Sequence, residues 1–170
     1  NRDGRRFVDE SPSLLEELNP QAGFRQPGGK YWMIIDERIR LGEGDEAGPD
    51  AVLPGLDWLD RIRRANAPLI VATTWEELFA RLAPDDIDVE VAAVELARFN
   101  DACRTGTSGR LSPPRRINAK PIERPPFYAL RCVAAITATC GGIAIDEHCR
   151  VLDTQARPLP GLFTAGVDAG

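Results

Sequence analysis

The sequence of 170 residues predicts an α+β fold on three observations. Two short apolar runs, residues 31–36 (YWMIID) and 69–73 (LIVAT), have the aromatic and β-branched composition of buried strands. Two stretches between residues 75 and 104 have the apolar spacing of amphipathic helices. After residue 124 the chain consists mainly of short strand-like runs separated by turns. A chain of this length can bury a sizeable core.

The first third of the chain predicts two strands separated by irregular segments. Residues 5–9 (RRFVD) predict a short strand, and residues 31–36 predict a buried one. Residues 11–30 contain three Pro and three Gly with little periodicity, so we expect a loop with one helical turn at 13–18. Residues 42–56 are rich in Gly, Pro and acidic residues, which is typical of a surface loop.

Three helices are predicted in the middle of the chain. Residues 57–65 (DWLDRIRRA) fit a short amphipathic helix with three inward side chains, Trp58, Leu59 and Ile62. Thr74 is followed three residues later by Glu77, a capping-box pattern that satisfies free amides at a helix start. We therefore expect a helix over 75–83. A longer helix is expected over 88–104, with one apolar stripe formed by Ala92, Leu96, Phe99 and Cys103.

A basic stretch follows the long helix. Residues 104–124 contain six basic residues and one acidic residue, a local charge of +5 in an acidic chain. The stretch also holds three prolines, so it predicts an extended linker and a domain boundary. The alternative is that Arg115, Arg116 or Arg124 binds a substrate carboxylate through both guanidinium nitrogens.

The last third of the chain predicts β-structure. Strands are expected over residues 127–138, 142–146 and 150–153. A Pro-Leu-Pro-Gly turn at 158–161 then leads to a further strand over 162–165.

Composition and charge exclude several classes of protein. The net charge of −5 and the pI of about 5.0 argue against general nucleic-acid binding, which needs a basic face. The longest apolar stretches are about ten residues, well short of the roughly 20 that span a bilayer, so no membrane span is expected. The four cysteines form no Cys-x-x-Cys pair, and we expect reduced thiols in a cytoplasmic protein without a metal site.

Common catalytic motifs are missing. The sequence has no G-x-x-x-x-G-K-[ST] phosphate loop, no G-x-G-x-x-G after a strand and no G-x-S-x-G elbow. His148 is the single histidine, which leaves little room for a Ser-His-Asp set. It lies between two predicted strands, and we interpret it as an exposed turn residue; a catalytic role is the alternative.

The two ends of the sequence predict an internal fragment of a longer protein. The chain starts at Asn1 without Met, and it stops at Gly170, directly after an apolar segment (LFTAG) that enters a Gly-containing turn.

Several segments, taken in order, resemble one family. The C-terminal segment contains PFYA, then I-T-x-T-x-G-G, V-L-D-T, P-x-P-G-L and an A-G turn. It resembles the C-terminal half of the flavin-binding domain in the fumarate reductase/succinate dehydrogenase flavoprotein family, which includes tricarballylate dehydrogenases and ketosteroid dehydrogenases. The opening NRDGRRFVDE resembles the family segment that leads into its capping domain, and residues 69–110 resemble the end of that cap.

The resemblance implies a domain layout. Residues 1–10 would be a segment of the FAD-binding domain, and residues 11–115 would be the capping domain that closes over the substrate. Residues 116–170 would be the C-terminal part of a Rossmann-like FAD-binding domain. The dinucleotide fingerprint of that domain is absent from the sequence, so we expect this chain alone not to hold FAD tightly.

The resemblance also implies cofactor-binding residues. Gly141 and Gly142 occupy the place where family members pass the flavin ring, and a missing side chain lets backbone approach a flat ring closely. The alternative is a tight turn between strands. Ala165 and Gly166 form the family turn beside the ribityl chain. Asp168 stands one position after the usual glutamate; it either binds ribityl hydroxyls or is a solvent-facing turn residue.

Departures from the family pattern weaken any assignment of fumarate as substrate. Thr137 (or Ala138) stands where flavocytochrome-type fumarate reductases have a histidine, and Leu14 falls roughly where an arginine is expected. The candidate catalytic residues are Thr137, Tyr128 and Arg124. Tyr128 is a possible proton donor, and its alternative is a core aromatic residue. Cys140 stands where Met is frequent, either facing the flavin or as a buried inert thiol.

Two functions follow from these observations. The first is part of an FAD-dependent oxidoreductase that exchanges a hydride with a C–C bond activated by a carbonyl or carboxylate. Its substrate would be a small organic acid, a steroid or another enone. The second is a non-enzymatic, cap-like module that binds a small acid or a protein partner.

Overall fold

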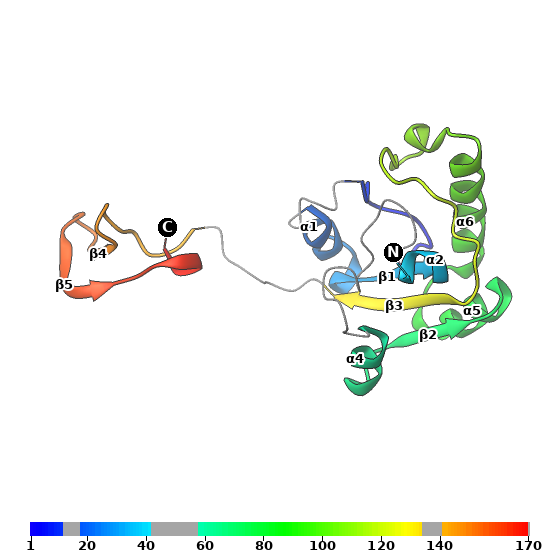
Figure 1. Ribbon diagram of the computed structural model, residues 1–170, viewed down its shortest axis with the longest axis horizontal. Coiled ribbons are helices and arrows are strands. Elements are labelled where there is room, and N and C mark those ends of the chain that lie inside the picture. The colour runs from blue at the N-terminus through cyan, green and yellow to red at the C-terminus, as the bar shows by residue number, and fades with distance from the viewer. Residues whose placement is uncertain (12–17, 42–57, 134–140, 170) are drawn as a thin grey trace. The chain divides into compact units, whose positions relative to one another are not determined.

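The computed structural model describes residues 1–11, 18–41, 58–133 and 141–169, in two compact units, Asn1–Ala134 and Ala135–Gly170 (Figure 1). The predicted surface loop at 42–56 lies outside the described residues, as do Leu14, Thr137, Ala138 and Cys140.

The secondary structure of the first unit matches most of the predicted elements. Its helices are α1 (Leu18–Phe24), α2 (Glu37–Arg40), α4 (Trp58–Arg64), α5 (Trp75–Leu82) and α6 (Val89–Arg104). Its strands are β1 (Lys30–Asp36), β2 (Leu69–Ala72) and β3 (Phe127–Val133). Short 3-10 turns occupy Pro27–Gly29, Ala83–Asp85 and Ser108–Arg110. The mixture confirms the α+β class.

An antiparallel sheet forms the centre of the first unit, with strand order β1-β3-β2. Tyr128 of β3 lies opposite Ile35 of β1 and Val71 of β2. Because successive side chains of a strand point to opposite faces, β3 supplies residues to two separate cores.

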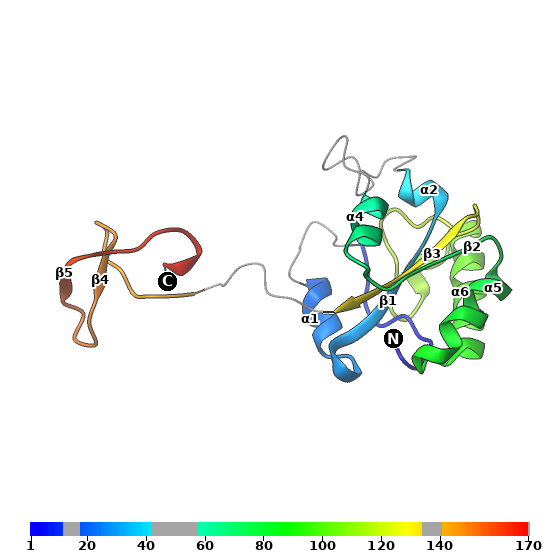
Figure 2. The same ribbon diagram turned by 90° about the horizontal axis from the view of Figure 1, so that it is seen from below.

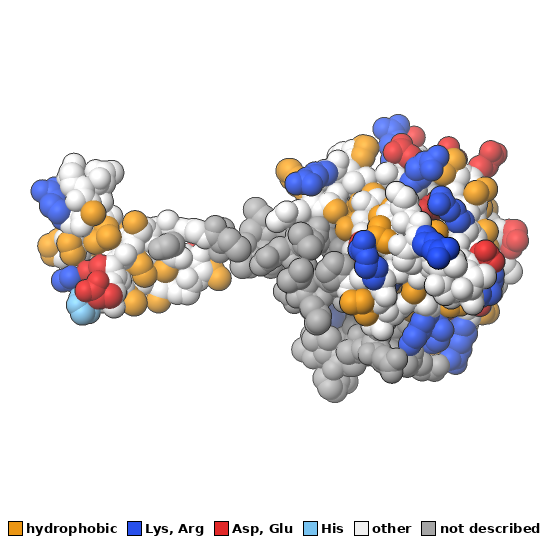
Figure 3. Space-filling view, turned by 90° about the horizontal axis from the view of Figure 1, so that it is seen from above, with side chains coloured by type: hydrophobic (Ala, Val, Ile, Leu, Met, Phe, Trp, Pro, Cys, Tyr) orange, Lys and Arg blue, Asp and Glu red, His pale blue; other side chains and the backbone are white. Residues whose placement is uncertain are grey.

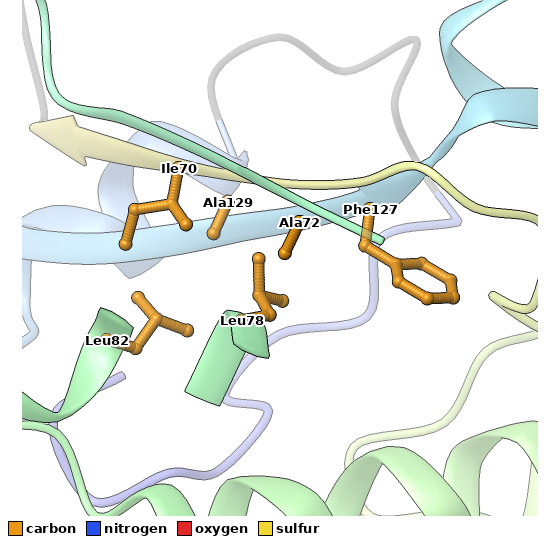
Figure 4. Packing of buried hydrophobic residues seen from close by; sticks show 6 residues of the cluster. All are labelled: Ile70, Ala72, Leu78, Leu82, Phe127 and Ala129. Atoms are coloured by element: carbon orange, nitrogen blue, oxygen red, sulfur yellow. The ribbon is translucent and has the colours of Figure 1, made fainter. Parts of the chain in front are cut away.

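One core lies between the sheet and helix α5. Leu78 and Leu82 of α5 are fully buried against the strands, as Figure 4 shows. The strand residues of this cluster are Ile70, Ala72, Phe127 and Ala129. The other core lies on the opposite face, where Leu59 of α4 packs with Ile35, Tyr128 and Leu130. Helices therefore cover both faces of the sheet (Figure 2).

Side-chain caps fix the starts of the two long helices. The Thr74 hydroxyl accepts a hydrogen bond from Glu77 N at 3.2 Å, and Glu77 Oε2 accepts one from Thr73 N at 2.9 Å. This confirms the capping box, with the return bond displaced by one residue. Asp88 caps α6 by accepting from Val91 N at 3.0 Å. The predicted α6 stripe is only half-buried; the buried residues of this helix are Asn100 and Ala102.

Two predictions for the first thirty residues are wrong. Residues 5–9 form no strand; Arg6 instead donates to Pro113 O at 2.8 Å and pairs with Glu10, so side-chain bonds hold this segment. Part of the predicted loop at 11–30 is helix α1. A Cβ on its Gly23 would lie 2.5 Å from Tyr31 Cε1, so close packing on β1 explains a glycine inside the helix.

The basic stretch at 104–124 is irregular but closely bound to the first unit. Asn100 accepts from Ile122 N at 2.8 Å and donates to Ile122 O at 2.9 Å. The stretch then enters β3, and the division between the two compact units falls after Ala134. The predicted domain boundary stays a prediction. The assignment of 116–170 to a flavin domain stays a prediction for the whole protein.

The second unit contains a small hairpin, β4 (Arg150–Leu152) and β5 (Pro158–Phe163). The predicted turn at 158–161 is wrong, since Pro-Leu-Pro-Gly lies inside β5, whose pairing with β4 is irregular. Prolines are tolerated there because edge strands have free N–H positions. The turn forms around Asp153, whose carboxylate accepts from the backbone N–H groups of Gln155 and Arg157.

The second unit buries little of its own apolar surface. Among residues 141–169, Val151 alone is buried. Its large exposed apolar side chains are Ile143, Leu159, Leu162, Phe163 and Val167. Figure 3 shows hydrophobic side chains over much of the visible surface of this unit. So small a unit usually needs further contacts to be stable.

Candidate functional site

The structure brings two predicted cofactor-binding segments together in the second unit. Ile143 N donates to Asp168 O at 2.9 Å, and Ile143 forms a parallel bridge with Ala169. The paired glycines therefore run directly beside the turn that contains Gly166, as a shared flavin site would require.

Backbone atoms of the chain leave no room for a side chain at Gly142. A Cβ at this position would lie 2.3 Å from Asp168 O and 2.7 Å from Asp168 C. No side chain fits there, because both neighbours are backbone atoms that cannot move aside cheaply. The contact is made with a distant segment of the chain and not within a turn between adjacent strands. Contact of Gly142 with a flavin stays a prediction.

Gly141 and Gly166 present bare backbone to open space. Their φ angles are +110° and +76°, which side chains rarely tolerate, and nothing lies within 4 Å of a Cβ built at either position. Ala165 before the turn is extended, and the Asp168 side chain is exposed. Two uncovered glycines beside an exposed carboxylate fit the edge of a flat cofactor with hydroxyl groups, so these residues are compatible with FAD.

The first unit contains a second candidate site, a cluster of Tyr128, Glu37 and Arg40. The Tyr128 hydroxyl donates to Glu37 Oε2 at 2.5 Å. Arg40 donates from Nε to Glu37 Oε2 at 2.6 Å and from Nη2 to Oε1 at 2.5 Å. The guanidinium and carboxylate form a bidentate pair. The ring of Tyr128 is buried, whereas the side chains of Glu37 and Arg40 are 17% and 19% exposed.

Burial and hydrogen bonds fix the protonation states of this cluster. Burial, together with the bond to Glu37, raises the pKa of Tyr128 to about 12. The hydrogen bonds from Arg40 lower the pKa of the Glu37 carboxyl, and the same bonds raise the pKa of Arg40. Near neutral pH the tyrosine is therefore a neutral donor that holds an ionised carboxylate. Both proposed roles of Tyr128, core aromatic residue and proton-bearing group, are compatible with this geometry.

Arg124 lies in a groove beside this cluster. Its charge contributes to the low pKa of the Glu37 carboxyl, and its backbone O accepts from Glu37 N at 3.0 Å. The groove is lined by Asp36, Arg38, Pro121, Glu123, Arg124 and Pro125. Of the three candidate catalytic residues, Tyr128 and Arg124 thus flank Glu37, and Thr137 lies outside the described residues.

The remaining candidates form no further site in the part of the chain that the structure describes. Cys103 and Cys132 are half-buried free thiols, and burial raises the pKa of each. His148 is 67% exposed, as expected for a turn residue. No group of three potential metal ligands occurs among the described residues. None of the helices described here is long and apolar enough to span a membrane.

Sequence reasoning missed Glu37, Arg40 and the buried Asp36. Glu37 and Arg40 are three residues apart, which is the spacing of an ion pair on one helical turn. This spacing could have predicted their contact from the sequence. Their contact with Tyr128 had no local signal, because the pairing of β1 with β3 creates it.

Comparisons with known proteins agree with the resemblance. The FAD binding domain model matches residues 1–170. A urocanate reductase from Eggerthella lenta is 34% identical over 100% of this chain and 26% of its own length. A 3-oxosteroid 1-dehydrogenase from Comamonas testosteroni is 47% identical over 82% of this chain and 26% of its own length.

Solved structures give the same result. The open conformation of a flavocytochrome c3 fumarate reductase matches 100% of this chain with a TM-score of 0.65 and 25% identity. This chain covers 26% of that structure and a similar share of both relatives. Since the family model matches the chain from end to end, the chain belongs to the FAD binding domain family, in the group that includes fumarate reductases and ketosteroid dehydrogenases.

Proposed function

We propose that the full-length protein is an FAD-dependent oxidoreductase that acts on a carbon–carbon bond next to a carbonyl or carboxylate. The family match carries this proposal, supported by the contact between the Gly142 and Gly166 segments. Relatives are named as reductases of urocanate and acrylate and as a steroid dehydrogenase, so the substrate class is a small organic acid, a steroid or another enone. FAD, when bound, supplies the hydride chemistry.

The residues proposed for FAD are Gly141, Gly142, Ala165, Gly166 and Asp168. Gly141 and Gly166 would present bare backbone to the cofactor, and the exposed Asp168 carboxylate would accept from cofactor hydroxyls. In the proposed layout, 1–10 and 116–170 belong to the FAD-binding domain, and 11–115 form a capping domain that excludes water from the reaction.

The proposed proton-handling group is the cluster of Tyr128, Glu37 and Arg40. A hydride transfer to or from carbon requires a matching proton transfer, and the group that gives or takes the proton must lie within hydrogen-bond reach of the substrate. Glu37 and Arg40 are the partly exposed members, and Tyr128 is a positioning residue that holds Glu37 from inside the core.

Expression of the full-length gene tests the proposal. The purified protein is expected to show the visible absorbance of oxidised flavin, and dithionite is expected to bleach it. A folded but colourless protein would contradict the proposal and favour a non-enzymatic binding module.

A further inference from the structure

A second groove, of about 340 Å³, opens where the turn Pro27–Gly29 leads into β1. Two aromatic residues of that strand, Tyr31 and Trp32, line it, together with two acids that follow helix α5, Asp85 and Asp86. Its volume falls in the range of small-molecule sites, roughly 300–1,000 Å³. This β1 groove therefore has room for a small ligand.

Neighbouring side chains hold the two aromatic rings of the β1 groove in place. Tyr31 packs edge-to-face against Phe7, with ring centroids 5.5 Å apart, and a Cβ at Gly23 would lie 2.5 Å from its Cε1. Trp32 is half-buried and packs against the core beneath α5. Burial raises the pKa of Tyr31 above its ordinary value of 10, so the phenol is neutral near neutral pH. The rings are thus preorganised and add no negative charge.

Two successive glycines leave the backbone of the turn bare. Gly28 and Gly29 have φ angles of +67° and +62°, and nothing lies within 4 Å of a Cβ built at either position. Gly28 lines the β1 groove. Peptide groups in this left-handed conformation, without side chains, can be approached closely by a phosphate.

The charges that line the β1 groove favour an anion. Asp86 pairs with Arg2 at 2.5 Å, and Asp85 pairs with Arg131 at 3.7 Å. Both acids thus have a guanidinium partner that lines the same groove. Lys30 lines it as well, is exposed, and forms no ion pair with the residues that the structure describes. Its ammonium group is therefore the surplus charge of the groove.

We propose that the β1 groove binds a mononucleotide. Its phosphate lies at Lys30 and the bare backbone of Gly28, because lysine is a compact charge that suits phosphate. Its base lies against Tyr31 and Trp32, because a flat ring gains contact area on aromatic side chains. This inference does not depend on the proposed flavin chemistry.

Calorimetric titration of the full-length protein with adenosine 5′-monophosphate tests the inference. The variant Lys30→Gln is expected to weaken binding by about tenfold or more, the effect of losing one charged hydrogen bond. Lys120→Gln is the matched control, since Lys120 is the other lysine of the chain and does not line the groove. This control is expected to bind the nucleotide as the unmodified protein does.

Chemical acetylation of lysine amines locates the ligand on the unmodified protein. Mass spectrometry of peptides is expected to show that adenosine 5′-monophosphate protects Lys30 from acetylation and leaves Lys120 reactive. Equal acetylation of Lys30 with and without the nucleotide would overturn the proposal. If Lys30→Gln fails to fold, this measurement decides the matter.

A series of ligands separates recognition of a nucleotide from attraction of any anion or any ring. Adenosine and inorganic phosphate are each expected to bind at least about tenfold more weakly than the monophosphate. Absence of nucleotide binding, undiminished binding by Lys30→Gln, or equal binding of adenosine or of phosphate would overturn the proposal.

Flavin absorbance recorded during the titration distinguishes the β1 groove from a flavin site. Retained flavin together with nucleotide binding that Lys30→Gln weakens supports the groove. Release of flavin in proportion to the nucleotide bound would show that the nucleotide occupies the flavin site, and would overturn the proposal. A colourless protein whose nucleotide binding depends on Lys30 would support the groove and refute the proposed function.

Discussion

The carbonyl oxygen of Asp168 occupies the space that a side chain at Gly142 would need. A Cβ there would lie 2.3 Å from it, and the adjacent Ile143 N donates to the same oxygen at 2.9 Å. The contact joins the two glycine-containing segments that are proposed to meet the flavin.

Gly142→Ala is expected to break this contact, since backbone would have to move to accept the new methyl group. Amide hydrogen exchange at Ile143 should become faster by about tenfold or more, as expected for the loss of one hydrogen bond. Gly109→Ala is the control, because nothing lies within 4 Å of a Cβ at that position. Unchanged exchange at Ile143 in Gly142→Ala would show that the segments tolerate a side chain there.

Asp36→Asn is expected to lower the free energy of unfolding by about 1–3 kcal/mol. The amide replaces one acceptor oxygen with a donor, which faces backbone N–H groups that need an acceptor. Urea unfolding measures the change. Asp101→Asn on the exposed side of α6 makes the same chemical substitution and should leave stability nearly unchanged. Equal stabilities of the two variants would contradict the role of Asp36.

The two tyrosines of the chain should ionise late in an alkaline titration. Burial raises the pKa of Tyr31 above 10, and the pKa of Tyr128 rises to about 12. A raised pKa means that the folded state binds the proton more tightly. The contribution of protonated Tyr128 to the free energy of unfolding is therefore fully present below pH 10, the ordinary pKa of tyrosine. It is lost as the pH rises towards 12.

Ultraviolet absorbance of tyrosinate measures this ionisation. Tyr128→Phe should remove the later step, and Tyr31→Phe should retain it. If the later ionisation step survives in Tyr128→Phe, the raised pKa does not belong to Tyr128, and its hydrogen bond to Glu37 does not delay its ionisation.

Thr74→Ala should destabilise the first unit by about 0.5–2 kcal/mol, the usual effect of losing a helix N-cap. The hydroxyl of Thr74 accepts from Glu77 N, and alanine leaves that amide without its partner. Thermal unfolding measures the change. The exposed Thr154 is a control for the same substitution. An equal effect at both positions would argue against a capping role.

Local patterns predicted the elements whose signals lie within a few residues. Strands β1 and β2 appear as apolar runs, and the Thr74–Glu77 spacing located the start of α5. Helix α1 was missed because Pro20 and Gly23 argue against a helix locally. Its formation depends on packing against Tyr31, which no local pattern shows.

The candidate site was predicted only in part for the same reason. The family resemblance predicts Gly141, Gly142 and Gly166 as flavin-binding residues, and this stays a prediction. Tyr128 was a candidate because of its position in the PFYA segment. Its partner Glu37 lies 91 residues away in sequence, so only the β1–β3 pairing brings them together. The groove that contains Arg124 likewise depends on Asp36 meeting the segment before β3.

The strand order has a consequence for protein synthesis. Among the described strands of the first unit, β3 is the last to leave the ribosome, yet it lies in the middle and is hydrogen-bonded to both β1 and β2. Until Phe127–Val133 emerges, neither earlier strand has its neighbour in the sheet, and their apolar faces depend on helices or chaperones for cover. A nascent chain arrested before this point is therefore expected to be unusually prone to aggregate.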